Sequence, residues 1–168
     1  GGGTDAFARP LTKVLSAAFG QSFVIDNRAG AGGTLGAELA AKSPADGYNW
    51  LVGAVHHTIA VSLYPKLGYD LQKDLMPCTM LASVPNVVVI NPQRLPQIKS
   101  FADFQKYVKA NPGRLNFASA GGGTASHLSG ELMKLTAGID LVHVPYKGTG
   151  PAITDVIGKR VTMMLAPI

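Results

Sequence analysis

NFASAGGGTASHL, residues 116–128, is the stretch that decides the fold. It opens with a short apolar run, typical of a buried strand, and three glycines (residues 121–123) follow almost at once. From Thr124 onward, leucines recur at helical spacing until Gly138, a residue that commonly ends helices. The stretch therefore predicts a strand, a tight glycine loop and a helix, which is the repeating unit of α/β proteins.

The same alternation extends over the whole chain. Helices are expected from Thr4 to Gly20 with a kink or delay at Pro10, from Thr34, from Ser100 with Asp103 as a capping box, and over residues 152–157. Strands are expected at residues 23–25, 48–52, 139–144 and 161–165, and the less regular middle holds two apolar runs at residues 78–82 and 87–90. These elements predict an α/β fold with mostly parallel sheets. The segment 91–99 holds two prolines and is expected to cross between two domains, residues 1–92 and 93–168.

Composition narrows the class of protein. The chain has 168 residues, 46% hydrophobic and 15% charged, which is enough apolar material for a core. No apolar run approaches the ~18 residues of a membrane span, and the opening glycine run does not resemble a signal peptide. The net charge of +5 is scattered and not interleaved with aromatic residues, so a nucleic-acid partner is not expected. A modest positive field favours small anions instead.

Metal and cofactor chemistry finds little support in the sequence. The single cysteine, Cys78, excludes an internal disulfide and a cysteine-based metal cluster, and its apolar surroundings predict a buried, inert thiol. His56 and His57 are neighbours, so on a strand they would point to opposite faces and could not chelate one ion. The glycine loop at residues 30–36 lacks dinucleotide spacing, because Leu35 occupies the place of the third glycine. We expect neither a metal nor a cofactor.

Two other glycine loops share one design, in which glycines stand just before the start of a helix. They are residues 1–5 (GGGTD) and residues 119–124 (SAGGGT). The first turn of a helix presents unpaired N–H groups and a partial positive charge, which hold carboxylates or phosphates, and glycine lets the ligand approach the backbone. Two such loops could hold an anion from both sides of a cleft. The alternative, that the glycines only shape tight turns, remains open.

An enzyme is the main alternative to a binding protein. Ser119 lies at a strand-to-helix turn, the position of a hydrolase nucleophile, and His127 and His143 are possible bases. Phe117 replaces the first glycine of that motif, and no acid is placed to orient a base. Ser119 is therefore better interpreted as a hydroxyl donor to a bound anion. His127 could donate to a carboxylate or cap its helix, and His143 is expected to be structural.

Seven motifs, in order and covering nearly the whole chain, carry a family resemblance. They are residues 1–5 (GGGTD), 26–33 (DNRAGAGG), 46–48 (DGY), 82–87 (ASVPNV), 116–121 (NFASAG), 126–128 (SHL) and 142–148 (VHVPYKG). The sequence resembles the Bug-type, or TctC-type, receptors of tripartite tricarboxylate transporters.

The resemblance implies a type II periplasmic binding fold, with two α/β domains and a central cleft. It implies a periplasmic receptor that captures a small carboxylate, such as a di- or tricarboxylic acid, an amino acid or an aromatic acid. The receptor would deliver this ligand to the membrane subunits of a transporter, without a catalytic step. A periplasmic ligand sensor on the same fold would share every loop and differ only in its partner protein.

The resemblance also assigns ligand-binding residues. One loop would contribute Gly2, Gly3, Thr4 and Asp5, and the other Ser119, Gly121, Gly122, Gly123 and Thr124. His56 and His57 would shape the distal part of the pocket, where family members often carry small polar residues.

Length is the main departure from the family, whose members are about twice as long. They carry a strand before the first glycine loop and a return crossing after the second domain, so both domains are expected to be incomplete here. Loss of that strand would leave neighbouring N–H and C=O groups unpaired. We therefore expect a fragment, stabilised by a dimer partner or by exchanged elements.

Overall fold

Two compact units make up the chain, Gly1–Ser83 and Val84–Ile168. The computed structural model describes residues 3–167, so Gly1, Gly2 and Ile168 lie outside the described residues. The segment 91–99, expected to cross between domains, lies inside the second unit, because the strand that precedes it pairs within that unit. The assignment of residues 1–92 and 93–168 to the two domains of the complete fold remains a prediction.

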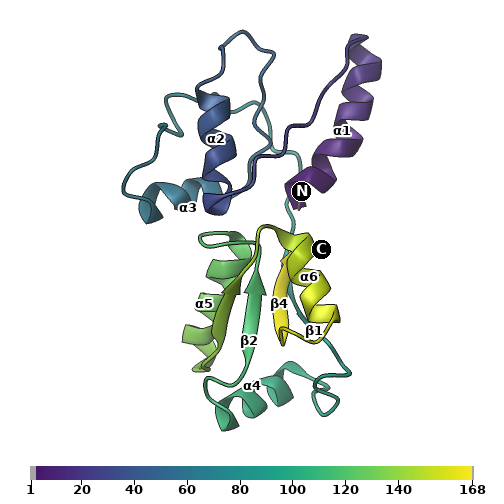
Figure 1. Ribbon diagram of the computed structural model, residues 1–168, viewed down its shortest axis with the longest axis vertical. Helices are drawn as coiled ribbons and strands as arrows, with labels where there is room; N and C mark the ends of the chain where they lie inside the picture. Colours follow the sequence, from purple (N-terminus) through teal and green to yellow (C-terminus); the bar gives the residue numbers. More distant parts are fainter. Residues whose placement is uncertain (1–2, 168) are drawn as a thin grey trace. The chain divides into compact units, whose positions relative to one another are not determined.

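The second unit is built on a four-stranded sheet with the strand order β1-β4-β2-β3 (Figure 1). Its strands are β1 (Asn86–Ile90), β2 (Asn116–Ser119), β3 (Val142–Pro145) and β4 (Met163–Pro167). The central strand β2 is parallel to both of its neighbours, as the alternating pattern predicts. Strand β1 runs antiparallel to β4, with Ile90 opposite Met163.

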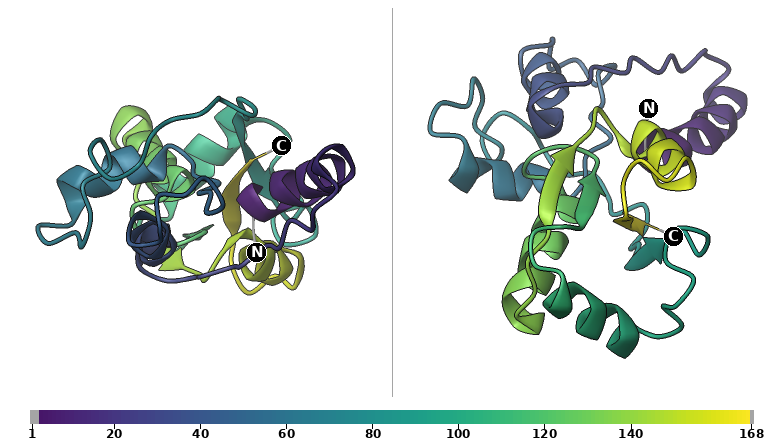
Figure 2. Two further views of the ribbon diagram at one scale, coloured as in Figure 1. Left: turned by 90° about the horizontal axis from the view of Figure 1, so that it is seen from above. Right: turned by 60° about the horizontal axis from the view of Figure 1, so that its bottom comes forward.

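Three helices cover the two faces of this sheet. Side chains that alternate along the strands pack against different helices on the two faces. The helices are α4 (Phe101–Ala110), α5 (Ala125–Ala137) and α6 (Thr149–Ile157). Phe117 and Met163 point into the larger core with α4 and its neighbours, while Ala118 and Met164 point into a smaller core under α6. Successive strand residues face opposite sides of a sheet. Accordingly, α6 lies on one side of the sheet, and α4 and α5 lie on the other (Figure 2).

The predicted start of α4 and the predicted end of α5 are confirmed, whereas α6 begins three residues before the expected residue 152. Helix α4 begins after Ser100, whose hydroxyl oxygen accepts from the Asp103 N–H at 3.1 Å. The Asp103 carboxylate in turn accepts from the Ser100 hydroxyl at 2.9 Å, so the two residues form the expected reciprocal cap. Helix α5 ends at Gly138, which adopts the left-handed conformation with φ of 60°.

The first unit contains helices but no paired strand among residues 3–83. Its elements are α1 (Gly3–Phe19), the 3₁₀ turn η1 (Ala31–Gly33), α2 (Thr34–Ala41) and α3 (His56–Leu63). Helix α1 continues through Pro10, so the proline neither ends nor delays the helix. No helix among the described residues is long and apolar enough to cross a membrane.

The strands expected at residues 23–25 and 48–52 are not formed, and those predictions were wrong; the apolar run at residues 78–82 forms no strand either. Hydrophobic composition favours a strand, but hydrogen bonds to a neighbouring strand hold it in place. None of these segments pairs with another described segment, and the side chains of Val24, Tyr48 and Met80 are 87%, 89% and 81% exposed. For the same reason Cys78 is exposed and not buried as expected.

Helix α5 packs closely against β2 at Gly130, where the absence of a side chain makes room for the Phe117 ring. A Cβ added at Gly130 would lie 2.3 Å from the ring of Phe117, which is fully buried and has no room to move. Alanine favours helices by about 1 kcal/mol, but overpacking a rigid core costs about 1–3 kcal/mol. We expect Gly130→Ala to lower the free energy of unfolding by about 1–2 kcal/mol in denaturant titrations. Gly150→Ala is the control, because a Cβ there meets nothing within 4 Å and should not destabilise α6.

Candidate functional site

The candidate site is the loop of residues 119–124, which joins the carboxyl end of β2 to the start of α5. The end of β3 lies beside it, because the Tyr146 N–H donates to the Ser119 carbonyl at 3.0 Å. One step further, the Gly148 N–H donates to the Ala120 carbonyl at 3.1 Å, just before α6 begins at Thr149. The first turns of α5 and α6 therefore meet at one edge of the sheet. Ligands of α/β proteins bind outside the carboxyl ends of such strands.

Most main-chain N–H groups of the loop are bonded within the protein. The Ala120 N–H donates to Ser126 Oγ at 3.0 Å, and the Gly121 N–H donates to Ser119 Oγ at 3.1 Å. The Gly123 N–H donates to His127 Nδ1 at 3.1 Å, and the Thr124 N–H to the Gly121 carbonyl at 3.3 Å. The glycines thus shape the loop, and these amides are not directed at a ligand.

The first turn of α5 is where the unpaired donors lie. Its N-cap residue, Thr124, makes no side-chain cap, because its hydroxyl donates to the Gly121 carbonyl at 2.6 Å. Among the residues that the structure describes, the N–H groups of Ala125, Ser126 and His127 contact no acceptor. N–H groups at the positive end of a helix can bind an anion, so this turn is the candidate for a binding site. Helix α6 also begins without a side-chain cap.

Two of the three loop glycines are needed for conformational reasons. Gly121 and Gly123 have φ of 133° and 77°, in the region that side-chain-bearing residues rarely adopt. Gly122 has no such constraint, and a Cβ added there would meet nothing within 4 Å. The loop geometry therefore depends on residues 121 and 123 more than on residue 122.

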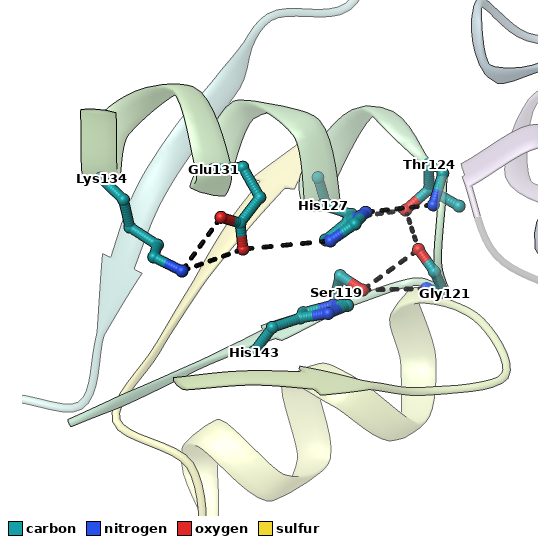
Figure 3. A network of polar contacts seen from close by, with 9 residues as sticks. Ser119, Gly121, Thr124, His127, Glu131, Lys134 and His143 are labelled. Atoms are coloured by element: carbon teal, nitrogen blue, oxygen red, sulfur yellow. Dashed lines mark hydrogen bonds and ion pairs between the residues drawn. The ribbon is translucent and has the colours of Figure 1, made fainter. Parts of the chain in front are cut away.

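A half-buried pair of histidines, His127 and His143, supports the loop (Figure 3). His143 Nε2 lies 2.7 Å from Ser119 Oγ, and the rings of His143 and His127 stack with centroids 4.0 Å apart. Because His127 Nδ1 accepts from Gly123, the ring proton of neutral His127 is assigned to Nε2, which faces Glu131 at 4.0 Å. Burial, and then the neighbouring His127, lower the pKa of His143. Both histidines therefore act as loop supports.

Ser119 is enclosed by this network. Its side chain is fully buried, and its hydroxyl contacts both the Gly121 backbone and His143. The expected role as a hydroxyl donor to a ligand requires an accessible oxygen, and this geometry uses the oxygen inside the loop. The same burial opposes a role as a nucleophile, because a substrate carbonyl must approach within contact distance.

The residues expected to bind ligand in the first unit lie on α1 and α3, apart from Gly2, which is outside the described residues. Gly3, Thr4 and Asp5 lie in the first turn of α1, so Thr4 is inside the helix and not its cap. The Asp5 carboxylate accepts from Asn27 at 2.8 Å and from Arg9 at 2.9 Å, and these bonds hold the pKa of Asp5 below its usual value. Asp5 thereby fastens α1 to the segment after it.

His56 and His57 lie in the first turn of α3 and not on a strand, so the expectation that they point to opposite faces was wrong. Their rings are neighbours, with centroids 4.2 Å apart. His57 is 6% exposed, and its Nδ1 has no hydrogen-bond partner among the described residues. Burial, and then the neighbouring His56, lower the pKa of His57 to about 4. Both rings are therefore hydrogen-bonding groups and not cations at neutral pH, because burial also lowers the pKa of His56.

Sequence reasoning missed the first turn of α6 and the role of Ser126 in fixing the loop. The signal for α6 was present in Gly148-Thr149-Gly150-Pro151, because proline is favoured in the first turn of a helix. No signal identified Ser126, whose bond to Ala120 depends on how the loop folds back on itself. Within the described residues, no group of three potential ligands could hold a metal ion.

Uncapped helix starts at the carboxyl ends of parallel strands are the arrangement by which α/β proteins bind small anions. Comparison with known proteins makes this more specific. The family model described as the tripartite tricarboxylate transporter family receptor matches residues 7–168, so the chain belongs to that family. This finding confirms the resemblance found in the sequence.

Relatives and solved structures agree with this assignment. A curated protein from the tcbD-tcbE intergenic region of Pseudomonas sp. strain P51 is 40% identical over 168 residues, covering 98% of this chain and 48% of the relative. An R. palustris structure with adipate is 37% identical with a TM-score of 0.91, and it covers 99% of this chain and 55% of the other. MatC from Rhodopseudomonas palustris, with bound malate, is 34% identical with a TM-score of 0.84, covering 99% and 56%.

These likenesses confirm the periplasmic binding protein fold, of which the chain represents a part. The chain spans about half the length of the curated relatives that it matches.

The buried His57 ring predicts a loss of stability in acid. In the unfolded chain histidine has a pKa of about 6.5, so the unfolded state binds a proton first as the pH falls. Stability is therefore fully present above about pH 6.5 and is lost as the pH falls towards the folded pKa of about 4. The loss should be about 2 kcal/mol, less than the full pKa shift because solvent screens part of the ring.

His57→Gln removes the titrating group, so the pH dependence of the melting temperature between these limits should become shallower. At about pH 8 both residues are neutral, so any difference in melting temperature there measures lost packing and is subtracted before the slopes are compared. An unchanged slope in the variant would show that His57 does not carry the acid sensitivity.

Proposed function

We propose that this chain is the ligand-capturing part of a periplasmic receptor that delivers a small carboxylate to a tripartite tricarboxylate-type transporter. The observation that carries the proposal is the uncapped first turn of α5, where the N–H groups of Ala125, Ser126 and His127 contact no described acceptor. The family match and the adipate and malate in related structures support a carboxylate as the ligand.

The chemistry of the α5 turn suits one carboxylate group. Its two oxygens accept from successive N–H groups, and the helix dipole adds about 0.3–1 kcal/mol in favour of the negative charge. Helix α6 begins beside this turn and adds a second uncapped start, with the N–H groups of Thr149 and Gly150. The net charge of +5 raises the local concentration of anions.

The remaining proposed ligand residues belong to the first unit. Gly3 and Thr4, in the first turn of α1, would supply main-chain donors of the same kind. His57 Nδ1 lacks a described partner, and an unmatched buried nitrogen costs about 1–3 kcal/mol until a partner reaches it. Because the ring is neutral at pH 7, we propose that it contacts a hydroxyl or another polar group of the ligand, not a second full charge.

A panel of ligands tests the proposal in the full-length protein. Aliphatic dicarboxylates, aromatic acids, amino acids and neutral sugars are compared by thermal shift and by calorimetric titration. A true ligand at about 100 times its Kd stabilises the folded state by about 2.7 kcal/mol, and we expect this from at least one acid. Stabilisation by neutral sugars with no response to any acid would overturn the carboxylate assignment.

Gly123→Ala tests whether the loop positions the α5 turn. A side chain at φ of 77° costs about 1–2 kcal/mol and disturbs the bond from the Gly123 N–H to His127, so we expect the Kd for the acid to rise about tenfold. Gly122→Ala is the matched control, because its Cβ has space and its φ is ordinary. Equal loss of affinity in both variants would mean that the loop conformation does not control binding.

The contact of 2.7 Å between Ser119 and His143 favours one other candidate function, a serine-dependent hydrolase. A fluorophosphonate probe distinguishes the two, because it labels only an accessible, activated serine. Since Ser119 is fully buried, we expect no labelling of this residue by mass spectrometry, with an active serine hydrolase as the positive control. Stoichiometric labelling at Ser119 that is lost in His143→Gln would establish the enzyme instead.

A further inference from the structure

A polar cavity lies in the second unit, away from the glycine loop. It has a volume of about 220 Å³. Leu115 and Thr162, which line it, immediately precede β2 and β4, so the cavity lies at the amino ends of these parallel strands. The loop of residues 119–124 follows the carboxyl end of β2. The two places are thus at opposite ends of the sheet, near α4 and near the start of α5 (Figure 1).

Two arginines that pair with no described acid line this cavity. The chain has five arginines, and Arg9, Arg28 and Arg160 each pair with an aspartate. The remaining two, Arg94 and Arg114, line the cavity and form no ion pair with any residue that the structure describes. Two like charges at one small cavity repel each other, and an anion bound between them removes that cost.

Two polar side chains in the cavity wall are hydrogen-bonded within the protein, so the two guanidinium groups are the charged donors left to bind a ligand. The Asn111 side-chain amide donates to the Tyr107 carbonyl at 2.9 Å, and the Thr162 hydroxyl donates to Asn116 at 2.9 Å. Thr162 is 1% exposed, so this wall is rigid. One amino group of Arg94 donates to the Lys159 carbonyl, which leaves its other donors for a ligand. Arg114 is exposed and makes no described side-chain hydrogen bond.

Asp140 is an acidic residue close to Arg114 in the fold, but within the described part of the chain it does not form an ion pair with either arginine. Its carboxylate approaches the backbone of Gly113. The positive charge of the cavity is therefore not balanced from within the unit.

We propose that this cavity is a second anion site, which binds one small oxyanion of the phosphate type through Arg94 and Arg114. Guanidinium groups bind tetrahedral and planar oxyanions through paired N–H donors, which a lysine does not reproduce. The site is separate from the carboxylate site in position and in chemistry, because it uses side-chain cations in place of helix N–H groups.

Inorganic phosphate is the probe, titrated into the isotope-labelled full-length protein at constant ionic strength. Binding is followed by nuclear magnetic resonance at the main-chain amides of Gly113, Arg114 and Thr162, which lie in or beside the cavity. We expect saturable shifts at these amides. Arg114→Gln should raise the Kd for phosphate about tenfold or more, and Arg114→Lys should restore only part of the affinity.

Lys109→Gln is the matched control, since it removes one positive charge from the exposed end of α4 without altering the cavity lining. It should change the Kd for phosphate less than twofold, and none of these variants should change binding of the carboxylate ligand. Absence of saturable shifts at the three amides would overturn the proposal. An equal effect of Lys109→Gln and Arg114→Gln would also overturn it, because binding would then reflect overall charge.

Discussion

The pairing of β2 between β4 and β3 is the constraint on which the candidate site depends. Ala118 lies opposite Met164 on one side and opposite Val144 on the other, so the end of β2 is fixed from both directions. The pairing continues beyond the strands, where the Ser119 and Ala120 carbonyls accept from Tyr146 and Gly148. This continuation holds the starts of α5 and α6 at one edge. A shift of one residue in β2 would move Ser119 to the other face and dissolve the histidine network.

Because hydrogen bonds within the protein use N–H groups of the loop, the N–H groups left for a ligand lie elsewhere. Glycine-rich loops before helices are usually interpreted as amide cradles, but here Ser119, Ser126 and His127 accept hydrogen bonds from three of the loop's own N–H groups. A loop held in this way costs less to order when a ligand arrives, because its conformation is already fixed. The donors that remain belong to the first turn of α5, which the rigid loop presents to the ligand.

The two units differ in how much of their apolar surface they bury. Both hydrophobic clusters found among the described residues lie in the second unit, around Phe117 and around Ala118. In the first unit, by contrast, apolar residues such as Val24 and Met80 remain largely exposed. Unit two therefore resembles an ordinary packed α/β layer structure. The first unit holds its helices through smaller contacts, such as the bonds of Asp5 with Asn27 and Arg9.

The sequence by itself determined the family, the α/β class, and the helices whose signals are local, because caps and periodicity act within a few residues. Ser100 with Asp103 and the stop at Gly138 are of this kind. Tertiary structure decided which apolar segments became strands, since residues 87–90 found a partner in β4 and residues 23–25 found none among the described residues. It also decided that Ser119 is enclosed and that Arg94 and Arg114 share a cavity. Burial and strand pairing depend on contacts between residues far apart in the sequence, and local residue spacing does not predict those contacts.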